Sequence, residues 1–383
     1  MTQPASSTLY DAIVVGLGAA GAGALYAFAK QGARVVGVDR YAPPHDQGSS
    51  HGETRMLRCA YGEGAGYTPL ALKSVDLWRA LEAKTGTRLF DQIGLTYAGP
   101  QSSAFLATTR ASAAKHGVPL RDLVGAERAS AGYVVPDDWQ CFLEPGAGFL
   151  YAERAIETLH AAAKARGADI VTGSPVRTIE SDGDEVRVVT GSATIRARRA
   201  VVCAGGWTAE LLPQLASVLS VERRDLHWFS DPKGRYAVSA GFRPFYIEDT
   251  DGLAVYGLPD WGGTGVKMGE HIEGAVSQHP DAVDRAARPD DVARTRRLAE
   301  RFFPDLGEVK RSAVCLYPMS RDEDFILDAA PGLPGVTVLA GLSGHGFKFI
   351  PVLGEAAARM ALGGEAGPEF AMFRLNRFEE TTS

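Results

Sequence analysis

The chain has 383 residues, of which 45% are hydrophobic and 22% are charged, and its formal net charge is −6. This length is too great for one simple core and suits two domains, or one domain with a large insertion. The composition is that of an ordinary globular protein. Because the net charge is negative and no long basic run occurs, we expect neither nucleic acid nor a membrane surface as a partner.

The four cysteines are scattered and include no CxxC pair: Cys59, Cys141, Cys203 and Cys315. This spacing argues against a zinc site and a disulfide framework, so we expect no metal and a reducing, cytoplasmic environment. Residues 12–29 carry no charge and are nearly long enough to span a bilayer. The preceding segment has no positive charge and ends in Asp11, and the stretch is rich in Gly and Ala, which predicts a packed turn and helix instead.

The first predicted unit is DAIVVGLGAAGAGALYAFAKQGARVVGVDR, a strand, a glycine-rich turn, a helix and a second strand. Gly16 permits the tight turn, Gly18 lets the backbone approach a pyrophosphate, and Gly21 lets the helix pack close to the strand. Asp39 ends the second strand, where a carboxylate can accept hydrogen bonds from ribose hydroxyls. The helix N-terminus adds free N–H groups and a partial positive charge. The unit predicts a dinucleotide site.

The motif itself does not distinguish NAD from FAD. It lies at the extreme N-terminus, and the rest of the chain does not continue as regular βα repeats. This arrangement is usual for two-domain flavoproteins, so we favour FAD.

A cationic segment follows, YAPPHDQGSSHGETRMLRCAYGEG, with His51, Arg55 and Arg58 at spacings of four and three. If ETRMLRCAY is helical, the three side chains share one face. A solvated basic face is one interpretation. The other is a ligand site, because the loop delivers the segment to the edge of the sheet where ligands bind in open α/β folds. Guanidinium groups there suit a carboxylate or a negative charge developing on a cofactor.

The middle of the chain alternates predicted strands and helices. GLTYAGP reads as a strand, and GFLYAERAIETLHAAAKARGADIVTGSPVRTIE reads as a helix, a glycine stop and a strand. VRVVTGSATIRARRAVVCAGGW reads as a hairpin and a buried strand in which Cys203 is a core residue. Four aromatic residues in the second half could face a bulky substrate, although a core position is slightly favoured: Phe245, Tyr246, Trp228 and Trp261.

GVKMGEH also reads as a strand, so Lys267, Gly269 and His271 share one face. A glycine between two basic residues opens a gap that suits a flat ligand. An exposed strand face with two basic residues is the alternative.

The segment AVCLY predicts a strand with Cys315 and Tyr317 on one side, and LSGHGFKF predicts a turn before a helix, carrying His345 and Lys348. Such a turn directs N–H groups towards an electron-rich group. The residues alone leave Cys315 as a buried filler, a nucleophile or an attachment point. No arrangement dedicated to acyl transfer accompanies it, which disfavours a hydrolase.

These segments resemble monomeric sarcosine oxidase and N-methyltryptophan oxidase, a family of flavoproteins that oxidise secondary amino acids. The resemblance is carried by GSSHGETRMLRCAYGEG, by Tyr256-Gly-Leu-Pro followed by Lys267 and His271, and by AVCLY with GLSGHGFKF, and it extends from Asp11 to about Phe378. The C-terminal segments look somewhat closer to N-methyltryptophan oxidase. Cys59 departs from the pattern, since relatives often carry His there.

The resemblance implies a role for each matching residue. Cys315 would be the covalent anchor of FAD, Lys267 would lie where oxygen reacts, and Arg58 with Lys348 would hold the substrate carboxylate. The implied catalytic residues are Lys267, His271, Arg55, Tyr317 and His345. The implied substrate-binding residues are Arg58, Lys348, Tyr256 and Tyr317. The implied cofactor-binding residues are Gly16, Gly18, Gly21, Asp39, His51, Arg55, Val176, Cys315, Gly344 and Lys348.

We therefore predict an α/β, two-domain flavoprotein. A Rossmann-like FAD domain would comprise residues 8–86, 146–222 and 312–375, and a mixed β-sheet substrate domain residues 87–145 and 223–311. The predicted reaction is oxidative demethylation of a small-molecule substrate, an N-methyl amino acid such as N-methyl-L-tryptophan or sarcosine, by molecular oxygen in a monomer. The alternatives are an oxidase of another secondary amine such as pipecolate or proline, a flavin dehydrogenase, and a non-catalytic flavin-binding protein.

Overall fold

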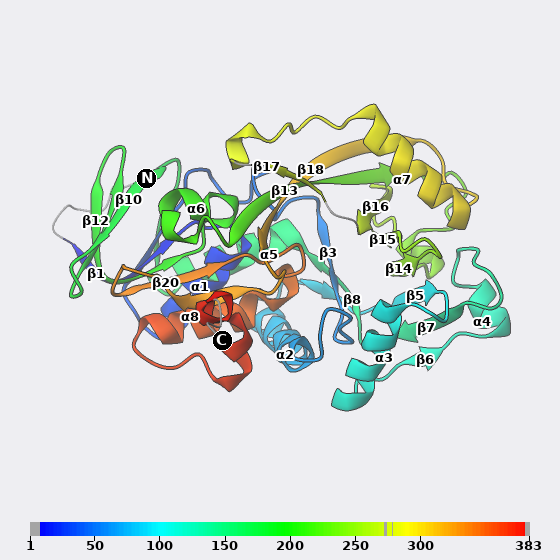
Figure 1. The fold of residues 1–383 in the computed structure, drawn as a ribbon, viewed down its shortest axis with the longest axis horizontal. Coiled ribbons are helices and arrows are strands. Elements are labelled where there is room, and N and C mark those ends of the chain that lie inside the picture. Colours follow the sequence, from blue (N-terminus) through cyan, green and yellow to red (C-terminus); the bar gives the residue numbers. More distant parts are fainter. Residues whose placement is uncertain (1–7, 272–273, 278, 380–383) are drawn as a thin grey trace.

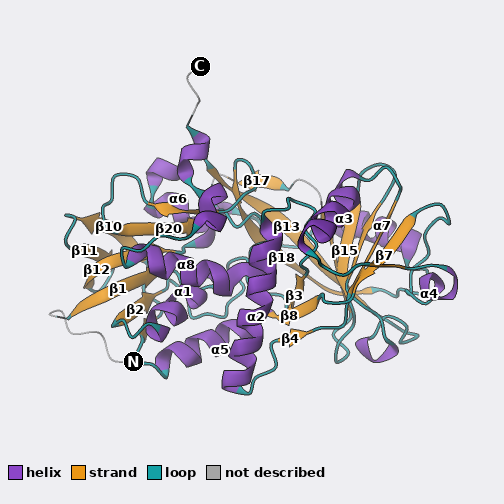
Figure 2. Ribbon diagram, turned by 90° about the horizontal axis from the view of Figure 1, so that it is seen from below, coloured by secondary structure: helices purple, strands orange, loops and turns teal. Residues whose placement is uncertain are grey.

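The computed structural model describes residues 8–271, 274–277 and 279–379. Two large mixed sheets form two lobes, side by side along the long axis of the molecule, and a small third sheet lies between them (Figure 1). Helices gather beside the sheet of the N-terminal lobe (Figure 2). The predicted α/β class, with a Rossmann-like unit and a second mixed sheet, is confirmed.

The first sheet has eight strands. Its centre is parallel and consists of β9 (Asp169–Val171), β2 (Val35–Val38), β1 (Leu9–Val15), β12 (Thr194–Val202) and β20 (Val336–Ala340). Antiparallel strands extend it: β10 (Val176–Ser181), β11 (Val186–Thr190) and β19 (Ile326–Ala329). The innermost parts of β1, β2 and β20 are nearly continuous apolar runs because both of their faces are buried.

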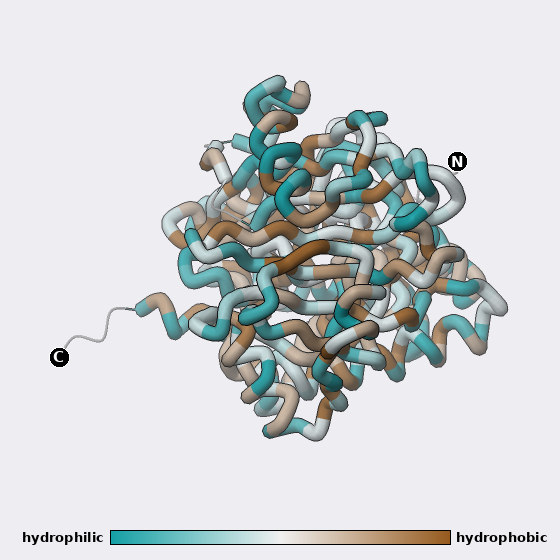
Figure 3. The backbone as a smooth tube through the Cα atoms, turned by 90° about the vertical axis from the view of Figure 1, so that its right-hand side faces the viewer, coloured by the Kyte–Doolittle hydropathy of each residue, from teal (hydrophilic) through white to brown (hydrophobic). Residues whose placement is uncertain are grey.

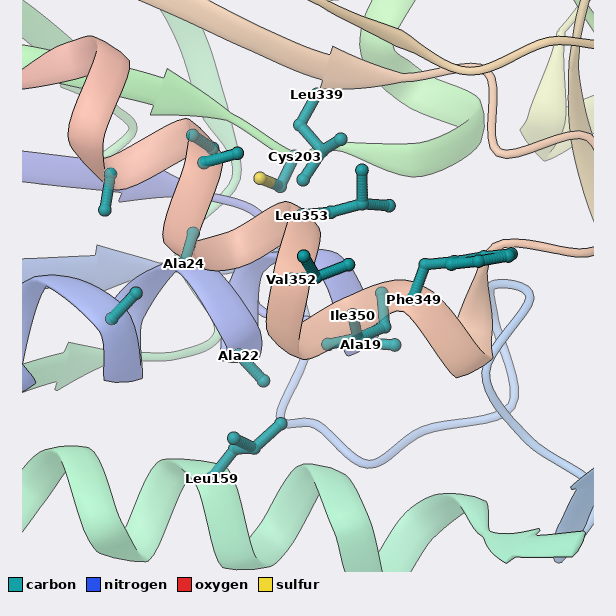
Figure 4. Close-up of a cluster of buried hydrophobic side chains, with 14 of the residues drawn as sticks. Ala19, Ala22, Ala24, Leu159, Cys203, Leu339, Phe349, Ile350, Val352 and Leu353 are labelled. Carbon is teal, nitrogen blue, oxygen red and sulfur yellow. The ribbon is translucent and has the colours of Figure 1, made fainter. Parts of the chain in front are cut away.

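One face of this sheet is covered by α1 (Ala19–Lys30), α5 (Ala152–Lys164) and α8 (Ile350–Ala361), whose apolar side chains meet in the core (Figure 4). The α1–α8 crossing is close because it is made by glycines. A Cβ on Gly354 would lie 2.4 Å from the carbonyl carbon of Gly23. The other face packs on the short helix α6 (Thr208–Leu211) and the apolar residues that follow it.

The second sheet has nine strands. They are β5 (Leu95–Gly99), β6 (Arg121–Asp122), β7 (Gln140–Glu144), β13 (Leu219–Phe229), β14 (Phe245–Glu248), β15 (Ala254–Leu258), β16 (Val266–His271), β17 (Ala275–Ser277) and β18 (Val309–Ser320). Helix α7 (Pro289–Phe302) buries Leu298 and Phe302 against one face of it. Helices α3 (Ala104–His116) and α4 (Gly125–Ala129) lie in the same lobe (Figure 1). Figure 3 shows hydrophobic stretches along the strands in the middle of this lobe and hydrophilic residues on its outer turns.

The predicted domain limits fall inside two paired strands. Residue 222 lies within β13 and residue 312 within β18, and these strands pair from Leu219–Ser320 to Phe229–Val309. The second sheet therefore continues across both limits, and the residue bounds of the two domains stay a prediction.

The segment ETRMLRCAY is not a helix, which corrects the sequence-based expectation. Thr54–Leu57 forms strand β3, which pairs with β8 (Gly148–Tyr151), and β8 also pairs with β4 (Phe90–Asp91). Because side chains alternate on a strand, His51, Arg55 and Arg58 do not share one helical face. Helix α2 (Tyr67–Thr85) begins only after this segment.

The other predicted elements named above form where expected. The glycine-rich stretch over 12–29 is β1 and α1, and no helix in the described ranges is both long and apolar enough to cross a bilayer. Cys203 is buried, and the aromatic residues Trp228, Phe245 and Tyr246 are buried while Trp261 is partly buried, in agreement with core positions.

Candidate active site

The turn between β1 and α1 forms one end of a cavity. Gly16 has a φ of +87°, and a Cβ there would lie 2.5 Å from the carbonyl oxygen of Cys203. A Cβ on Gly21 would lie 1.7 Å from the carbonyl oxygen of Gly16. Above Gly18 the nearest atom is the Ser50 Oγ at 3.9 Å, so the backbone is open there. This open backbone at a helix N-terminus is what a pyrophosphate needs.

Asp39 holds its carboxylate at the end of β2. One oxygen accepts the N–H of Leu17 at 2.6 Å and the other accepts the N–H of Tyr41 at 2.7 Å. Burial raises the pKa of Asp39, and the two N–H bonds oppose this shift. The carboxylate lines the cavity, where it can bind the hydroxyl groups of a ribose.

The cavity has an empty volume of about 1360 Å³, including the part open to solvent. It is lined by the glycine-rich turn, the loop Ala204–Trp207 and Tyr317. Seven of the predicted residues line it: Gly16, Gly18, Asp39, Arg55, Val176, Tyr317 and Gly344. Four predicted cofactor residues do not: Gly21, His51, Cys315 and Lys348. Gly21 contributes by letting helix α1 pack closely against the turn at Gly16. His51, Cys315 and Lys348 lie close behind the wall of the cavity.

Cys315 is a buried residue of β18 with two basic neighbours. Its Sγ lies 3.4 Å from the Nε2 of His51 and 4.0 Å from an Nη of Arg55. Burial raises the pKa of the thiol, and the charge of Arg55 opposes this. Burial, with Arg55 adding to it, lowers the pKa of His51 to about 4. A neutral imidazole therefore lies within hydrogen-bonding distance of the Cys315 thiol.

Lys267 is held by a strained turn. Its Nζ donates to the carbonyl oxygens of Gly52 at 3.0 Å and Thr54 at 2.5 Å. Between them Glu53 has a φ of +70°, which side chains rarely adopt. Glu153, at the start of α5, accepts the N–H groups of Gly52 at 2.7 Å and Glu53 at 3.1 Å. Burial lowers the pKa of Lys267 well below its usual value. Backbone strain that is held in place by several neighbouring contacts is concentrated at functional sites.

Arg58 and Lys348 both contact Tyr61. The Arg58 guanidinium lies 4.2 Å from the centre of the Tyr61 ring, and the Lys348 Nζ donates to the Tyr61 hydroxyl at 3.2 Å. Burial lowers the pKa of Lys348 to about 7. Arg58 also forms an ion pair with Glu63. Burial acts to raise the pKa of Glu63, but the charge of Arg58 outweighs it and holds that pKa well below the usual range.

His345 lies against the same tyrosine. Its Nδ1 is 2.7 Å from the Tyr61 hydroxyl, and its carbonyl oxygen accepts the Lys348 ammonium at 2.9 Å. Burial lowers the pKa of His345 to about 3, so the ring is neutral at physiological pH.

Tyr317 and Tyr256 meet through their hydroxyl groups at 3.2 Å. Gly344 has a φ of +76°, and a Cβ there would lie 2.1 Å from the Tyr317 ring. The Tyr317 ring therefore packs directly against the backbone of Gly344. The space above Gly269, which the sequence assigned to a flat ligand, is taken by the Tyr256 hydroxyl, 2.7 Å from where a Cβ would be. His271 is exposed at the end of β16.

Strand register places several of these side chains on one face of the nine-stranded sheet. Trp228 and Leu258 both pair with Lys267, and Tyr256 pairs with Gly269. Cys315 packs with Trp228 and contacts Tyr256 and Tyr317. Lys267, Cys315 and Tyr317 therefore belong to one site, and Arg58, Lys348 and His345 form a second group around Tyr61.

Four residues of the site were not singled out from the sequence: Tyr61, Glu63, Glu144 and Glu153. Tyr61 and Glu63 lie within the quoted segment AYGEG, which is the signal that could have found them. Glu144 and Glu153 carry no local signal, because their partners lie at least 47 residues away in the chain. Within the described ranges, no cluster of three or more His, Cys, Asp or Glu side chains could hold a metal ion.

The residues present fit FAD: the open backbone at Gly18 suits the pyrophosphate, Asp39 suits the ribose, and the cavity continues to the side chains around Tyr317. Fold and site together define a flavin-dependent oxidoreductase. Residues 11–360 match the family described as FAD dependent oxidoreductase (DAO), and the chain belongs to this family.

Relatives cover nearly the whole chain. It is 38% identical over 379 residues to a monomeric sarcosine oxidase of Bacillus sp. (strain NS-129), covering 97% of each chain. It is also 38% identical over 376 residues to an N-methyl-L-tryptophan oxidase of Yersinia pestis (strain Pestoides F), covering 96% of this chain and 99% of the relative. The fold matches the open form of NikD, described as an unusual amino acid oxidase essential for nikkomycin biosynthesis. That match has a TM-score of 0.84 at 24% identity, over 96% of this chain and 98% of NikD.

Proposed function

We propose that the protein oxidises the CH–NH bond of a secondary amino acid, with oxygen as the electron acceptor. The observation that carries this proposal is the pair of buried cations, Arg58 and Lys348, which both contact Tyr61. A guanidinium and an ammonium in a dry pocket suit the carboxylate of an amino acid. The names of the two oxidase relatives support the same substrate class.

The substrate we propose is an N-methyl amino acid, either N-methyl-L-tryptophan or a sarcosine-like compound. The reaction consumes one oxygen and one water for each N-methyl group. It releases the primary amino acid, formaldehyde and hydrogen peroxide. FAD, when bound, supplies the two-electron redox chemistry, and the protein supplies orientation and charge.

We assign a different role to each group of side chains in the site. Arg58 and Lys348 bind the substrate carboxylate, which takes the place of Glu63 beside Arg58. Tyr256, Tyr317, His271 and His345 line the substrate space. Lys267 provides positive charge where negative charge develops as oxygen is reduced, and electrostatic stabilisation of this kind is often the largest contribution to catalysis.

We also propose that FAD is attached covalently through Cys315. The support is the geometry of its neighbours: His51 lies 3.4 Å from the Cys315 Sγ and Arg55 lies 4.0 Å from it. Burial raises the pKa of the thiol, and the charge of Arg55 opposes this by favouring the thiolate. A thiolate, not a thiol, forms bonds at sulfur. For the whole protein we propose a cytoplasmic monomer: its four cysteines are free, and its large exposed apolar side chains are dispersed along the chain, such as Leu72, Val134 and Leu253.

The experiment that tests the function is anaerobic mixing of the purified holoenzyme with N-methyl-L-tryptophan and, separately, with sarcosine. We expect the visible flavin band to bleach rapidly with one of the two. Hydrogen peroxide should appear when oxygen is readmitted. Bleaching without peroxide would indicate a dehydrogenase. No bleaching by either compound would overturn the N-methyl assignment, and pipecolate and proline would be tried next. A flavin that no amine reduces would indicate a non-catalytic binding protein.

A further inference from the structure

Glu144, the last residue of β7, is a fully buried carboxylate. Its Oε1 accepts the backbone N–H groups of Cys59 at 2.6 Å and Ala60 at 3.2 Å. Its Oε2 accepts the hydroxyl of Tyr97 at 2.9 Å. All three donors are neutral. A carboxylate buried among neutral donors is costly unless a positive charge lies nearby.

The backbone that Glu144 holds comes directly after Arg58. The Arg58 Nη1 donates to the carbonyl oxygen of Ala60 at 3.1 Å, and the hydroxyl of Tyr97 lies 3.5 Å from the same oxygen. Cys59 is fixed on its other side as well, because its carbonyl oxygen accepts the Thr68 hydroxyl at 2.9 Å. Glu144 and Tyr97 therefore support the peptide against which the guanidinium rests.

The charge of Glu144 also acts on both cations of the group around Tyr61. Burial raises the pKa of Glu144, and the positive charge of Arg58 opposes this. Burial lowers the pKa of Lys348, and the charge of Arg58 adds to this. The negative charges of Glu63 and, to a smaller extent, of Glu144 oppose the shift.

We propose that Glu144 is the counter-charge and positioning residue of the substrate-carboxylate site, holding the backbone beneath Arg58 and keeping the Lys348 ammonium charged. This inference rests on the proposed function, in which Arg58 and Lys348 bind the carboxylate.

Several groups face the Lys348 ammonium, and few of them titrate near neutral pH. They are the Tyr61 hydroxyl, His345, Arg58, Glu63, Cys59 and Glu144. Burial raises the pKa of Tyr61 and of Cys59 well above neutral and lowers that of His345 to about 3. Lys348, with a pKa of about 7, is the group whose charge changes in the physiological range.

The test is calorimetric titration of the holoenzyme with 2-furoate and with its neutral counterpart 2-furamide, from about pH 5 to about pH 9. Neither compound carries an amine that could be oxidised. The wild-type protein should bind furoate more tightly than furamide. Furoate affinity should be full below about pH 7 and should fall as the pH rises and the Lys348 ammonium loses its proton, whereas furamide affinity should change little.

In Glu144→Gln the shape is kept and the negative charge is lost. The furoate midpoint should move to lower pH by about one unit, which lowers the affinity by up to about tenfold at pH values above both midpoints. Tyr97→Phe removes one hydrogen-bond donor from Glu144. This variant should shift the furoate midpoint in the same direction as Glu144→Gln, but by a smaller amount. The matched control is Glu82→Gln. Glu82 also accepts two backbone N–H groups through one oxygen, from Leu89 at 2.6 Å and Phe90 at 2.9 Å, and its change should leave the midpoint in place.

The outcomes separate the two proposals. An unchanged midpoint in Glu144→Gln, or in Tyr97→Phe if the first variant does not fold, would overturn the role of Glu144 and leave the carboxylate site standing. A wild-type protein that binds furoate no better than furamide would overturn the carboxylate site itself, and the role of Glu144 with it.

Discussion

Three buried cations of the site, Arg58, Lys267 and Lys348, differ in their neighbours. Arg58 is paired with Glu63, and Lys348 rests on the hydroxyl of Tyr61. The Lys267 ammonium donates to two backbone carbonyl oxygens, those of Gly52 and Thr54. The Lys267 Nζ is thus positioned by neutral acceptors. Burial lowers its pKa, and a negative charge that develops nearby favours its protonated, positively charged form.

Replacing Lys267 by Met should therefore affect one half-reaction more than the other. The rate of flavin reoxidation by oxygen should fall by about 10²-fold, while the rate of reduction by substrate changes far less. Stopped-flow absorption measures both rates on the same preparation. The matched control is Lys310→Met, an exposed lysine of β18, which should change neither. Equal changes in both half-reactions of Lys267→Met would contradict the role of Lys267.

At the scale of elements, helix α1 presents its N-terminus to the cavity and packs closely against α8. Gly23 and Gly354 make this contact possible, since a Cβ on Gly354 would lie 2.4 Å from the carbonyl carbon of Gly23, and one on Gly23 would lie 2.7 Å from the carbonyl oxygen of Ile350. Backbone atoms cannot move aside as a flexible side chain can.

Gly354→Ala should lower the free energy of unfolding by about 3 kcal/mol, because the added methyl group forces the two helices apart. Chemical denaturation monitored by circular dichroism measures this change. Gly146→Ala is the control: a Cβ there meets no atom within 4 Å, and we expect a change within about 0.5 kcal/mol. Equal stabilities of the two variants would show that the crossing tolerates a side chain.

At the scale of the whole molecule, the cavity joins the two lobes. Gly16 and Asp39 directly follow β1 and β2 of the eight-stranded sheet. Tyr317, which lines the cavity, and Cys315, which lies behind its wall, are on β18 of the nine-stranded sheet. A cofactor held at both ends therefore connects the lobes, and a covalent bond at Cys315 would make that connection permanent.

Cys315→Ser should release its flavin on denaturation with acid, whereas the wild-type protein and Cys141→Ala, a control at another buried cysteine, should retain it. The melting temperature of Cys315→Ser should also rise with added FAD, because a reversible ligand stabilises the folded state by about 2.7 kcal/mol at one hundred times its Kd. The wild-type melting temperature should not depend on added FAD. Release of flavin from the denatured wild-type protein would overturn the covalent proposal.

The sequence was most informative where function depends on neighbouring residues. The turn with Gly16, Gly18 and Gly21 and the acid Asp39 form one local unit, and its conformation follows from the residue types. The same local reasoning failed at β3. The spacing of His51, Arg55 and Arg58 fits a helix, but pairing with β8, about a hundred residues later in the chain, makes the segment a strand. Tertiary pairing outweighs local propensity in such short segments.

By itself, the sequence determined a dinucleotide-binding unit at the N-terminus, an α/β fold and the residue types from which a flavin site can be built. These follow from glycine, β-branched and acidic residues at short spacings, whose conformational preferences are local. Only the tertiary structure decided which charges meet. Lys348 contacts Tyr61 across 287 residues, His51 faces Cys315 across 264, and Glu144 supports the peptide after Arg58. Electrostatic interactions depend on distance in space and on burial, and neither is encoded in the spacing of residues along the chain.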